Sequence, residues 1–446
     1  MSAARTWTAA AFLIACMVLG GASAAGIIGN AALQIAAVAI LLVLLLKRGS
    51  PAAPEHRKPL TMLVAGIALL ALIQLLPLPP ALWTALPGRA AVVEAFGQLD
   101  LPLPWMPVTL APEGTIASLL ALLPPLAMLA LLLRTEAAGR RVWPLLVVAI
   151  ALVQLVLGIA QVAGGRNSPL YFYAYTNWGH EVGFFSNTNH HATLLLMAMP
   201  FAAALASQML RQPGQRHDTL AKTVIAGCIF AVLAGGVIVN GSRAGLVLLP
   251  LVLILCGCMI AADLSRRAPR LWFGIAVGTI AVGIAAAGAS GVMTRQQLGE
   301  GGSQTSRAAI WERSWPIAVE HQPTGSGLGS FVPLYRMAED PGERPRSYAN
   351  HAHNDYLEWF LETGVPGLIL LLAFFIWYAR RSWAAWSRPE ASFARAGSIA
   401  VAAVAIHSLV DYPIRTAAIA ALTALCCALL ATGSAELRKS HPLRSR

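Results

Sequence analysis

A short polar stretch, residues 351–362, stands directly before an apolar run that carries no further charge until Arg380. An imidazole can accept a proton near neutral pH, and a neighbouring carboxylate can orient it and raise its basicity. Ionisable groups at the edge of a membrane segment are costly to bury, so they indicate a functional site. The polar members of the stretch are His351, His353, Asn354, Asp355, Glu358 and Glu362.

His353 is the member best placed to act as a general base toward a hydroxyl group. Asn354 and Asp355 are its immediate neighbours, and a hydrogen bond to either would fix its tautomer. The structural alternative is the start of a helix, with Asn354 or Asp355 as the N-cap residue. A zinc site shared with His351 is disfavoured, because no third ligand has helical spacing to the pair.

The composition of the whole chain indicates lipid as its solvent. Of its 446 residues 57% are hydrophobic and 12% charged, whereas soluble domains average about 25% charged residues. Apolar runs of about 20 residues recur, and backbone hydrogen bonding in lipid requires them to be helical. We therefore predict an all-α polytopic membrane protein with twelve transmembrane helices. The predicted spans are 7–26, 27–46, 60–76, 114–133, 143–163, 191–210, 223–241, 244–262, 271–290, 356–378, 396–412 and 416–432.

Positive charge is spread unevenly over the segments that join these spans. Most of the 32 Lys and Arg residues fall on segments that share a side with the N-terminus. Because basic residues collect on the cytoplasmic side, this predicts that both termini are cytoplasmic. The same asymmetry accounts for the net charge of +12, which is therefore no sign of nucleic-acid binding.

The longer connecting segments fall on the outer side and set the domain division. They are 77–113, which is rich in Pro and Trp, 164–190, which is rich in aromatic residues, and 291–355, the largest. A helix is predicted from Ser306 to Glu320, with Trp311 and Trp315 on one face. We divide the chain into nine helices with the first two loops (1–290), the large periplasmic loop (291–355), and three helices with a short cytoplasmic tail (356–446).

Arginine side chains supply the positive charge expected on the outer side. Arg243 occupies a tight turn between two apolar spans, where its guanidinium must face lipid phosphate or the protein's own outer cavity. Arg307 and Arg313 follow on the large loop. Guanidinium groups bind phosphate oxygens in a bidentate manner, so these residues favour a pyrophosphate ligand.

Several other polar motifs have structural explanations. The glycine-rich segment 325–329 follows no predicted strand and has no Lys-Ser/Thr pair, which favours a structural turn over a phosphate loop. His407 and Asp411 lie one helical turn apart, which favours a buried structural pair over a substrate contact. Glu181, His190 and His191, which lead into the sixth span, are expected to line the same outer cavity.

The order of these motifs resembles that of the O-antigen ligase/polymerase superfamily. His353-Asn354, followed after nine residues by Gly364-Val-Pro-Gly367, resembles its H-[N/S/Q]-x9-G-x-x-G signature. The resemblance covers residues 183–415. Its other pieces are Asn187-Thr-Asn189-His190, Ser242-Arg243, Thr305-Ser306-Arg307, His321-Gln-Pro323 with Gly325-Ser-Gly327-Leu-Gly329-Ser-Phe331, and His407-Ser-Leu-Val-Asp411-Tyr-Pro413.

The resemblance implies a GT-C-like fold and an inverting, metal-independent glycosyltransferase without a cofactor. Such an enzyme moves a glycan from undecaprenyl pyrophosphate to an acceptor sugar at the periplasmic face of the bacterial inner membrane. By position, His353 would activate the acceptor hydroxyl, and Arg243 and Arg307 would hold the donor pyrophosphate. His351 is an added histidine, so the choice of base between the two stays open. Supporting or substrate-lining roles are expected for His351, Asn354, Asp355, Arg313, Asn189, His190, His407 and Asp411.

The superfamily contains ligases that use lipid A–core, repeat-unit polymerases, and ligases that use protein. We favour ligation onto lipid A–core, with O-antigen or exopolysaccharide repeat-unit polymerisation as the alternative. A polysaccharide-lipid transporter is the rival from another class, but transporters place broken helices near the membrane midplane. Here the polar residues cluster at the outer ends of the spans. The expected partners are the lipid-linked donor glycan, the acceptor glycan and membrane lipids, with no nucleic acid.

Overall fold

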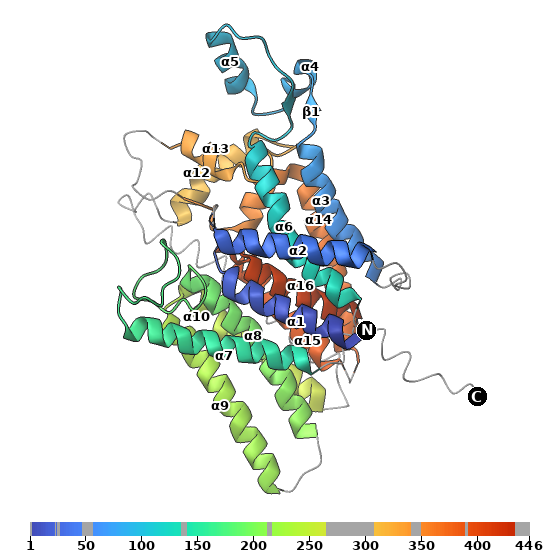
Figure 1. The fold of residues 1–446 in the computed structure, drawn as a ribbon, viewed down its shortest axis with the longest axis vertical. Helices are drawn as coiled ribbons and strands as arrows, with labels where there is room; N and C mark the ends of the chain where they lie inside the picture. Colours follow the sequence, from blue (N-terminus) through green and yellow to red (C-terminus); the bar gives the residue numbers. More distant parts are fainter. Residues whose placement is uncertain are drawn as a thin grey trace, which may run out of the picture.

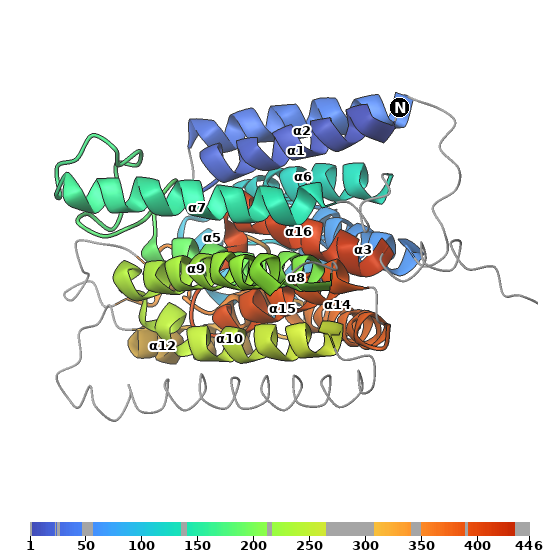
Figure 2. The same ribbon diagram turned by 90° about the horizontal axis from the view of Figure 1, so that it is seen from below.

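The described part of the chain is a bundle of long helices with two short strands (Figures 1 and 2). The computed structural model describes residues 2–22, 24, 27–46, 57–134, 141–211, 216–264, 307–339, 349–388 and 391–432. Helices dominate because each apolar segment must satisfy its own backbone hydrogen bonds where water is absent.

Seven helices in the described ranges are long and apolar enough to cross a membrane. These are α2 (Ile28–Leu46), α6 (Pro112–Leu133), α7 (Val142–Ala163), α8 (Thr188–Arg211), α9 (Arg216–Asn240), α10 (Arg243–Leu264) and α14 (Asp355–Trp386). The shorter apolar helices are α1 (Ser2–Leu19), α3 (Lys58–Gln74), α15 (Ser392–His407) and α16 (Ala417–Thr432). The chain is thus a polytopic, helical membrane protein.

Each predicted span except 271–290 overlaps one of these helices. Residues 271–290 lie outside the described ranges, so the count of twelve spans stays a prediction. The eleventh span was wrong at its end, because α15 ends at His407 and residues 408–410 form a turn. Pro413 disfavours a helical conformation at Tyr412, since a proline restricts the residue before it, but the helix already ends five residues earlier.

The centre of the bundle is α8, which packs against α9, α10 and α15. Most of its side chains from His190 to Ser207 are buried. α15 also packs on α16, where the Ala-rich surfaces allow the backbones to approach closely. At the far end of α15, a buried ion pair joins Arg395 to Asp263 of α10. These contacts fix the α15–α16 connection relative to the start of α8.

Two smaller units lie beside the ends of the long helices. Between α3 and α6, β1 (Pro77–Leu78) pairs antiparallel with β2 (Met106–Pro107), accompanied by α4 (Pro80–Trp83) and α5 (Ala90–Gln98). α12 (Arg307–Glu320) and α13 (Phe331–Met337) lie together beside α14 (Figure 1). The helix predicted for 306–320 is confirmed. The residues of their shared apolar core are Ile310, Ile317, Ala318, Phe331, Tyr335, Ala352 and Leu361.

Candidate active site

The polar stretch before α14 adopts a sharp turn that ends in a capped helix. The Asn354 side chain accepts hydrogen bonds from the amides of Tyr356 at 3.0 Å and Leu357 at 3.1 Å, so Asn354 is the N-cap. His353 immediately before it has φ +50°, a conformation that few non-glycine residues adopt. Trp311 of α12 donates to the carbonyl of Ala352 at 2.8 Å and holds the turn from the other side.

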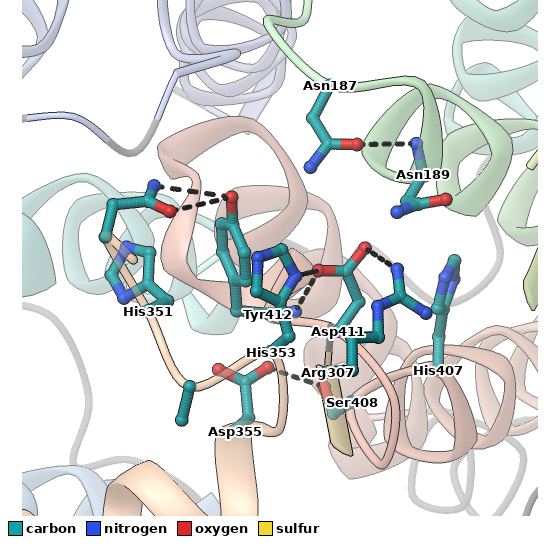
Figure 3. Close-up of polar contacts among 12 residues, drawn as sticks. Asn187, Asn189, Arg307, His351, His353, Asp355, His407, Ser408, Asp411 and Tyr412 are labelled. Carbon is teal, nitrogen blue, oxygen red and sulfur yellow. Dashed lines mark hydrogen bonds and ion pairs between the residues drawn. The ribbon is translucent and has the colours of Figure 1, made fainter. Parts of the chain in front are cut away.

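His353 is oriented by a buried carboxylate from a distant part of the chain. Its Nδ1 lies 3.0 Å from Oδ1 of Asp411, whose side chain is fully buried (Figure 3). The other oxygen of Asp411 lies 3.5 Å from Nη2 of Arg307. The amide of Tyr412 also donates to Asp411, at 3.0 Å. Because an ionised carboxylate only accepts, Nδ1 of His353 is the donor, and Nε2 is left as a proton acceptor.

The charge of Asp411 is stabilised by its surroundings. Burial alone would raise its pKa, but the hydrogen bond from His353, the charge of that ring when it is protonated, and the charge of Arg307 hold the pKa well below its usual range. These contacts favour the ionised form of Asp411. An imidazolium formed at His353 would be stabilised by this neighbouring negative charge.

The predicted side-chain pair between His407 and Asp411 does not form. Nδ1 of His407 lies 2.8 Å from Oγ1 of Thr193 on α8, and the Asp411 carboxylate faces His353 and Arg307 instead. The prediction was wrong because α15 ends at His407, so Asp411 lies in the following loop and not one turn further along a helix.

The neighbours expected to tune His353 are used elsewhere. Asn354 caps α14, as described above. The Asp355 carboxylate accepts from the Ser408 hydroxyl at 2.7 Å, while the Asp355 amide donates to the Ser408 carbonyl at 2.9 Å. The positive φ of His353 explains this, since it turns the imidazole away from the helix start and toward Asp411.

His351 belongs to a second carboxylate. Its Nδ1 lies 2.8 Å from Oε1 of Glu358, whose other oxygen accepts from the Ala352 amide at 2.8 Å. Within the described residues, no three His, Cys, Asp or Glu side chains are grouped so that they could hold a metal ion. The two histidines are thus held by separate acids, His351 by Glu358 and His353 by Asp411.

Arg415 joins three carboxylates on one face of α14. Its guanidinium lies 3.3 Å from Asp355, 3.4 Å from Glu358 and 3.3 Å from Glu362. Burial alone would lower the pKa of Arg415, but the three acids raise it above its usual value. Sequence reasoning missed this residue. The available signal was the i, i+3, i+7 spacing of the acids, which places them on one helical face and requires a cation from elsewhere.

The Tyr412 ring packs against three imidazoles. Ring centroids lie 4.4 Å away for His351, 4.8 Å for His353 and 5.0 Å for His190 of α8. The Tyr412 hydroxyl is bonded to the side chain of Asn350 at 3.3 Å. Burial raises the pKa of Tyr412 to about 12, so the phenol stays neutral at physiological pH. Tyr412, also missed by sequence reasoning, spaces the histidines from one another.

The starts of α8 and α10 are fastened together next to this cluster. The Ser242 hydroxyl donates to Oδ1 of Asn189 at 2.7 Å and accepts from the Gly245 amide at 3.0 Å. Ser242 therefore caps α10, and Arg243 is the first residue of that helix. The N-x-N-H and S-R motifs thus meet in space, as expected for parts of one site.

The arginines predicted to lie on the outer side have different surroundings. The Arg307 side chain is about a third exposed (35%) and contacts Asp411. The Arg243 side chain is exposed and, within the described residues, makes no ion pair with the His353 cluster. Arg313 donates to the Tyr335 hydroxyl at 3.3 Å and lies over its ring.

The glycine-rich segment 325–329 is a structural turn, as predicted. Its glycines all have positive φ, and every amide from 325 to 330 donates to an acceptor of the protein. Gly327 donates to the Glu362 carbonyl at 2.9 Å, and Gly329 to the Glu362 carboxylate at 2.8 Å. No amide of the turn is left for a phosphate, which a phosphate loop would require.

The backbone at Gly364 explains why the motif needs a glycine after the nine residues that follow Asn354. α14 is interrupted there, with φ +58° and ψ −150°. A Cβ at this position would lie 2.2 Å from the Pro323 carbonyl oxygen and 2.6 Å from the Gly325 amide. The glycine-rich turn therefore docks into the kink of α14, and only glycine permits that approach.

Glu181 and His191 do not line an open cavity. Both side chains are fully buried, with His191 Nδ1 3.3 Å from Oε1 of Glu181. Burial raises the pKa of Glu181 to about 7. His190 is also fully buried, but it lies against Tyr412 and so belongs to the cluster around His353. The expectation that all three would line the outer cavity was therefore wrong.

Comparison with known families gives one match. The model of the family described as O-antigen ligase matches residues 228–372. This segment begins in α9, contains Arg243, Arg307 and His353, and ends within α14. Asp411 and Arg415 lie beyond it. No curated protein matches the chain.

Proposed function

The chain belongs to the O-antigen ligase/polymerase superfamily, and on that premise we propose that it transfers a glycan from undecaprenyl pyrophosphate to an acceptor sugar. The observation that carries this proposal is the His353–Asp411–Arg307 arrangement, which combines an oriented imidazole with a guanidinium beside it. A base and a cation are the two groups that displacement of a pyrophosphate from an anomeric carbon requires.

In the proposed reaction His353 is the general base. Its Nε2 accepts the proton of the acceptor hydroxyl as that oxygen attacks the anomeric carbon. Asp411 holds Nδ1 and stabilises the imidazolium that forms. We assign the base role to His353 because its partner acid, Asp411, also contacts Arg307, whereas His351 is bound to Glu358.

Arg307 and Arg243 are proposed to stabilise the leaving group. The bond between the anomeric carbon and the pyrophosphate oxygen breaks, and its electron pair passes to the diphosphate, where guanidinium groups offset the charge. The configuration at the anomeric carbon inverts, since the acceptor enters from the face opposite the diphosphate. Both side chains are accessible enough to meet a ligand.

We propose lipid A–core as the acceptor and the periplasmic face of the inner membrane as the place of reaction. The test is transfer of a polyprenyl-pyrophosphate glycan by the purified full-length protein in EDTA. Wild type should transfer and H353A should not, whereas H351Q should retain most activity. A strict metal requirement, or full activity of H353A, would contradict the mechanism.

A deletion strain tests the acceptor. Accumulation of lipid-linked polymer together with bare lipid A–core supports ligation. Lipid A–core capped with single repeat units indicates a polymerase instead.

A further inference from the structure

A second site is suggested by an open cavity of about 600 Å³ in the loop between α7 and α8. It lies outside the segment matched by the family model and includes none of the residues around His353. Figures 1 and 2 place this loop (green) and α12 at the same end of the bundle. Its lining residues are Arg166, Asn167, Ser168, Tyr171 and Trp178.

The aromatic wall of the cavity is held rigidly. The Tyr171 hydroxyl donates to the His180 carbonyl at 2.9 Å and accepts from the Gly179 amide at 3.0 Å. The rings of Tyr171 and Trp178 pack edge to face with centroids 5.1 Å apart. These bonds join the two arms of the loop, so the wall is formed before any ligand arrives.

The rim of the cavity supplies polar groups without partners. Arg166 and Asn167 are exposed, and within the described residues their side chains make no hydrogen bond or ion pair. Gly179 has φ +82°, and a Cβ there would lie 3.1 Å from Cγ of Arg166. The glycine thus lets the arginine stem lie across the loop. No carboxylate lines the cavity, so its charge is positive.

We propose that this cavity binds an anionic pyranose, a sugar ring with a carboxylate or phosphate, of one of the two glycan substrates. The proposal rests on the proposed function. A pyranose has an apolar C–H face that packs on Trp178, hydroxyl edges that Asn167 and Ser168 can bind, and an anionic group that pairs with Arg166. A lipid phosphate would use the arginine but not the aromatic wall.

The second half of the loop, residues 177–188, connects the cavity to the candidate active site. The Asn177 amide donates to the Ser186 carbonyl at 3.3 Å, and its side chain accepts from the Thr188 amide at 2.9 Å. Thr188 begins α8, two residues before His190, which packs on Tyr412. A glycan seated in the cavity would therefore be held at a fixed position relative to His353, as a remote binding subsite requires.

The experiment measures sugar binding to the full-length protein in nanodiscs by saturation-transfer NMR. The probes are methyl β-glucuronoside and the neutral methyl β-glucoside. We expect R166A to weaken glucuronoside binding about tenfold, the loss of roughly one charge-assisted contact, and R166A/N167A to abolish it. R141A, at the other end of α7, is the matched control and should bind as wild type does.

Two outcomes would overturn the proposal. The first is glucuronoside binding that R166A/N167A leaves unchanged. The second is a signal from dihexanoylphosphatidylglycerol that depends on Arg166, with no signal from either sugar. That second result would indicate a site for a lipid headgroup. In glycan transfer, R166A should raise KM for whichever substrate, donor or acceptor, occupies the cavity and leave kcat unchanged. If sugar binding depends on Arg166 but the wild type transfers no glycan, the proposed function is contradicted and the binding site is not.

Discussion

Nδ1 of His353 and Oδ1 of Asp411 lie 3.0 Å apart, although 58 residues separate them in the chain. The loop between α15 and α16 brings them together by lying along the start of α14. Ser408 bonds both the amide and the carboxylate of Asp355 at one end of this contact, and Arg415 binds Asp355, Glu358 and Glu362 at the other. The position of Asp411 is thus set from both sides.

The orientation of His353 by Asp411 predicts a rate effect for D411N. The asparagine amide can present its NH2 group to Nδ1, which favours the wrong tautomer of His353, and it cannot stabilise the imidazolium. We therefore expect kcat to fall by roughly 10²–10⁴-fold, the usual contribution of a general base. Glycan transfer by purified protein measures this. The double variant H353A/D411N should be no slower than H353A, because the two residues act as one unit. Additive losses would show that Asp411 acts independently.

The Arg415 cluster predicts a stability effect. R415M removes the guanidinium shared by three acids, and leaving buried charges uncompensated costs about 3–5 kcal/mol. Thermal unfolding in detergent should show a large decrease in Tm. Replacing one acid in the same background, R415M/E362Q, should recover part of the loss. If R415M alone unfolds like wild type, the three contacts contribute nothing to stability.

The kink at Gly364 predicts that G364A is strongly destabilising. Alanine would have to adopt φ +58° with its Cβ against the Pro323 carbonyl, a cost of about 1–3 kcal/mol from backbone strain before any clash. The folded yield and Tm after purification report this. Gly97 is the matched control, since a Cβ there meets nothing within 4 Å; G97A should be neutral or slightly stabilising. Equal behaviour of the two variants would contradict the docking of the turn.

Sequence reasoning predicted the membrane helices well because the hydropathy of a segment depends directly on whether it is surrounded by lipid or by water. It also offered Asn354 as one of two N-cap candidates and predicted the structural role of the glycine-rich turn, both of which depend on local spacing. The role of His353 stays a prediction. It failed for the partner of His353, since helical periodicity suggested that Asp411 pairs with His407. That pairing required α15 to continue past His407, and the helix ends there. Arg415 and Tyr412 were missed because their partners lie more than 50 residues away, where periodicity carries no information.

Glu181 predicts a pH dependence of stability. Its pKa in the folded protein is raised by burial to about 7, against about 4.3 for an unperturbed glutamate. Between these values the folded state binds more protons than the unfolded state, so the free energy of unfolding falls as pH rises from about 4 to 7. The loss for this single group is on the order of 3 kcal/mol.

E181Q keeps the shape of the side chain and removes the titration. We therefore expect E181Q to be more stable than wild type at pH 8, with the difference shrinking toward pH 5, as measured by Tm in a series of buffers. Glu94 is exposed, and E94Q should track wild type at every pH. A constant difference between E181Q and wild type over this range would mean that Glu181 does not titrate on unfolding. Its contact with His191 would then hold it charged inside the protein.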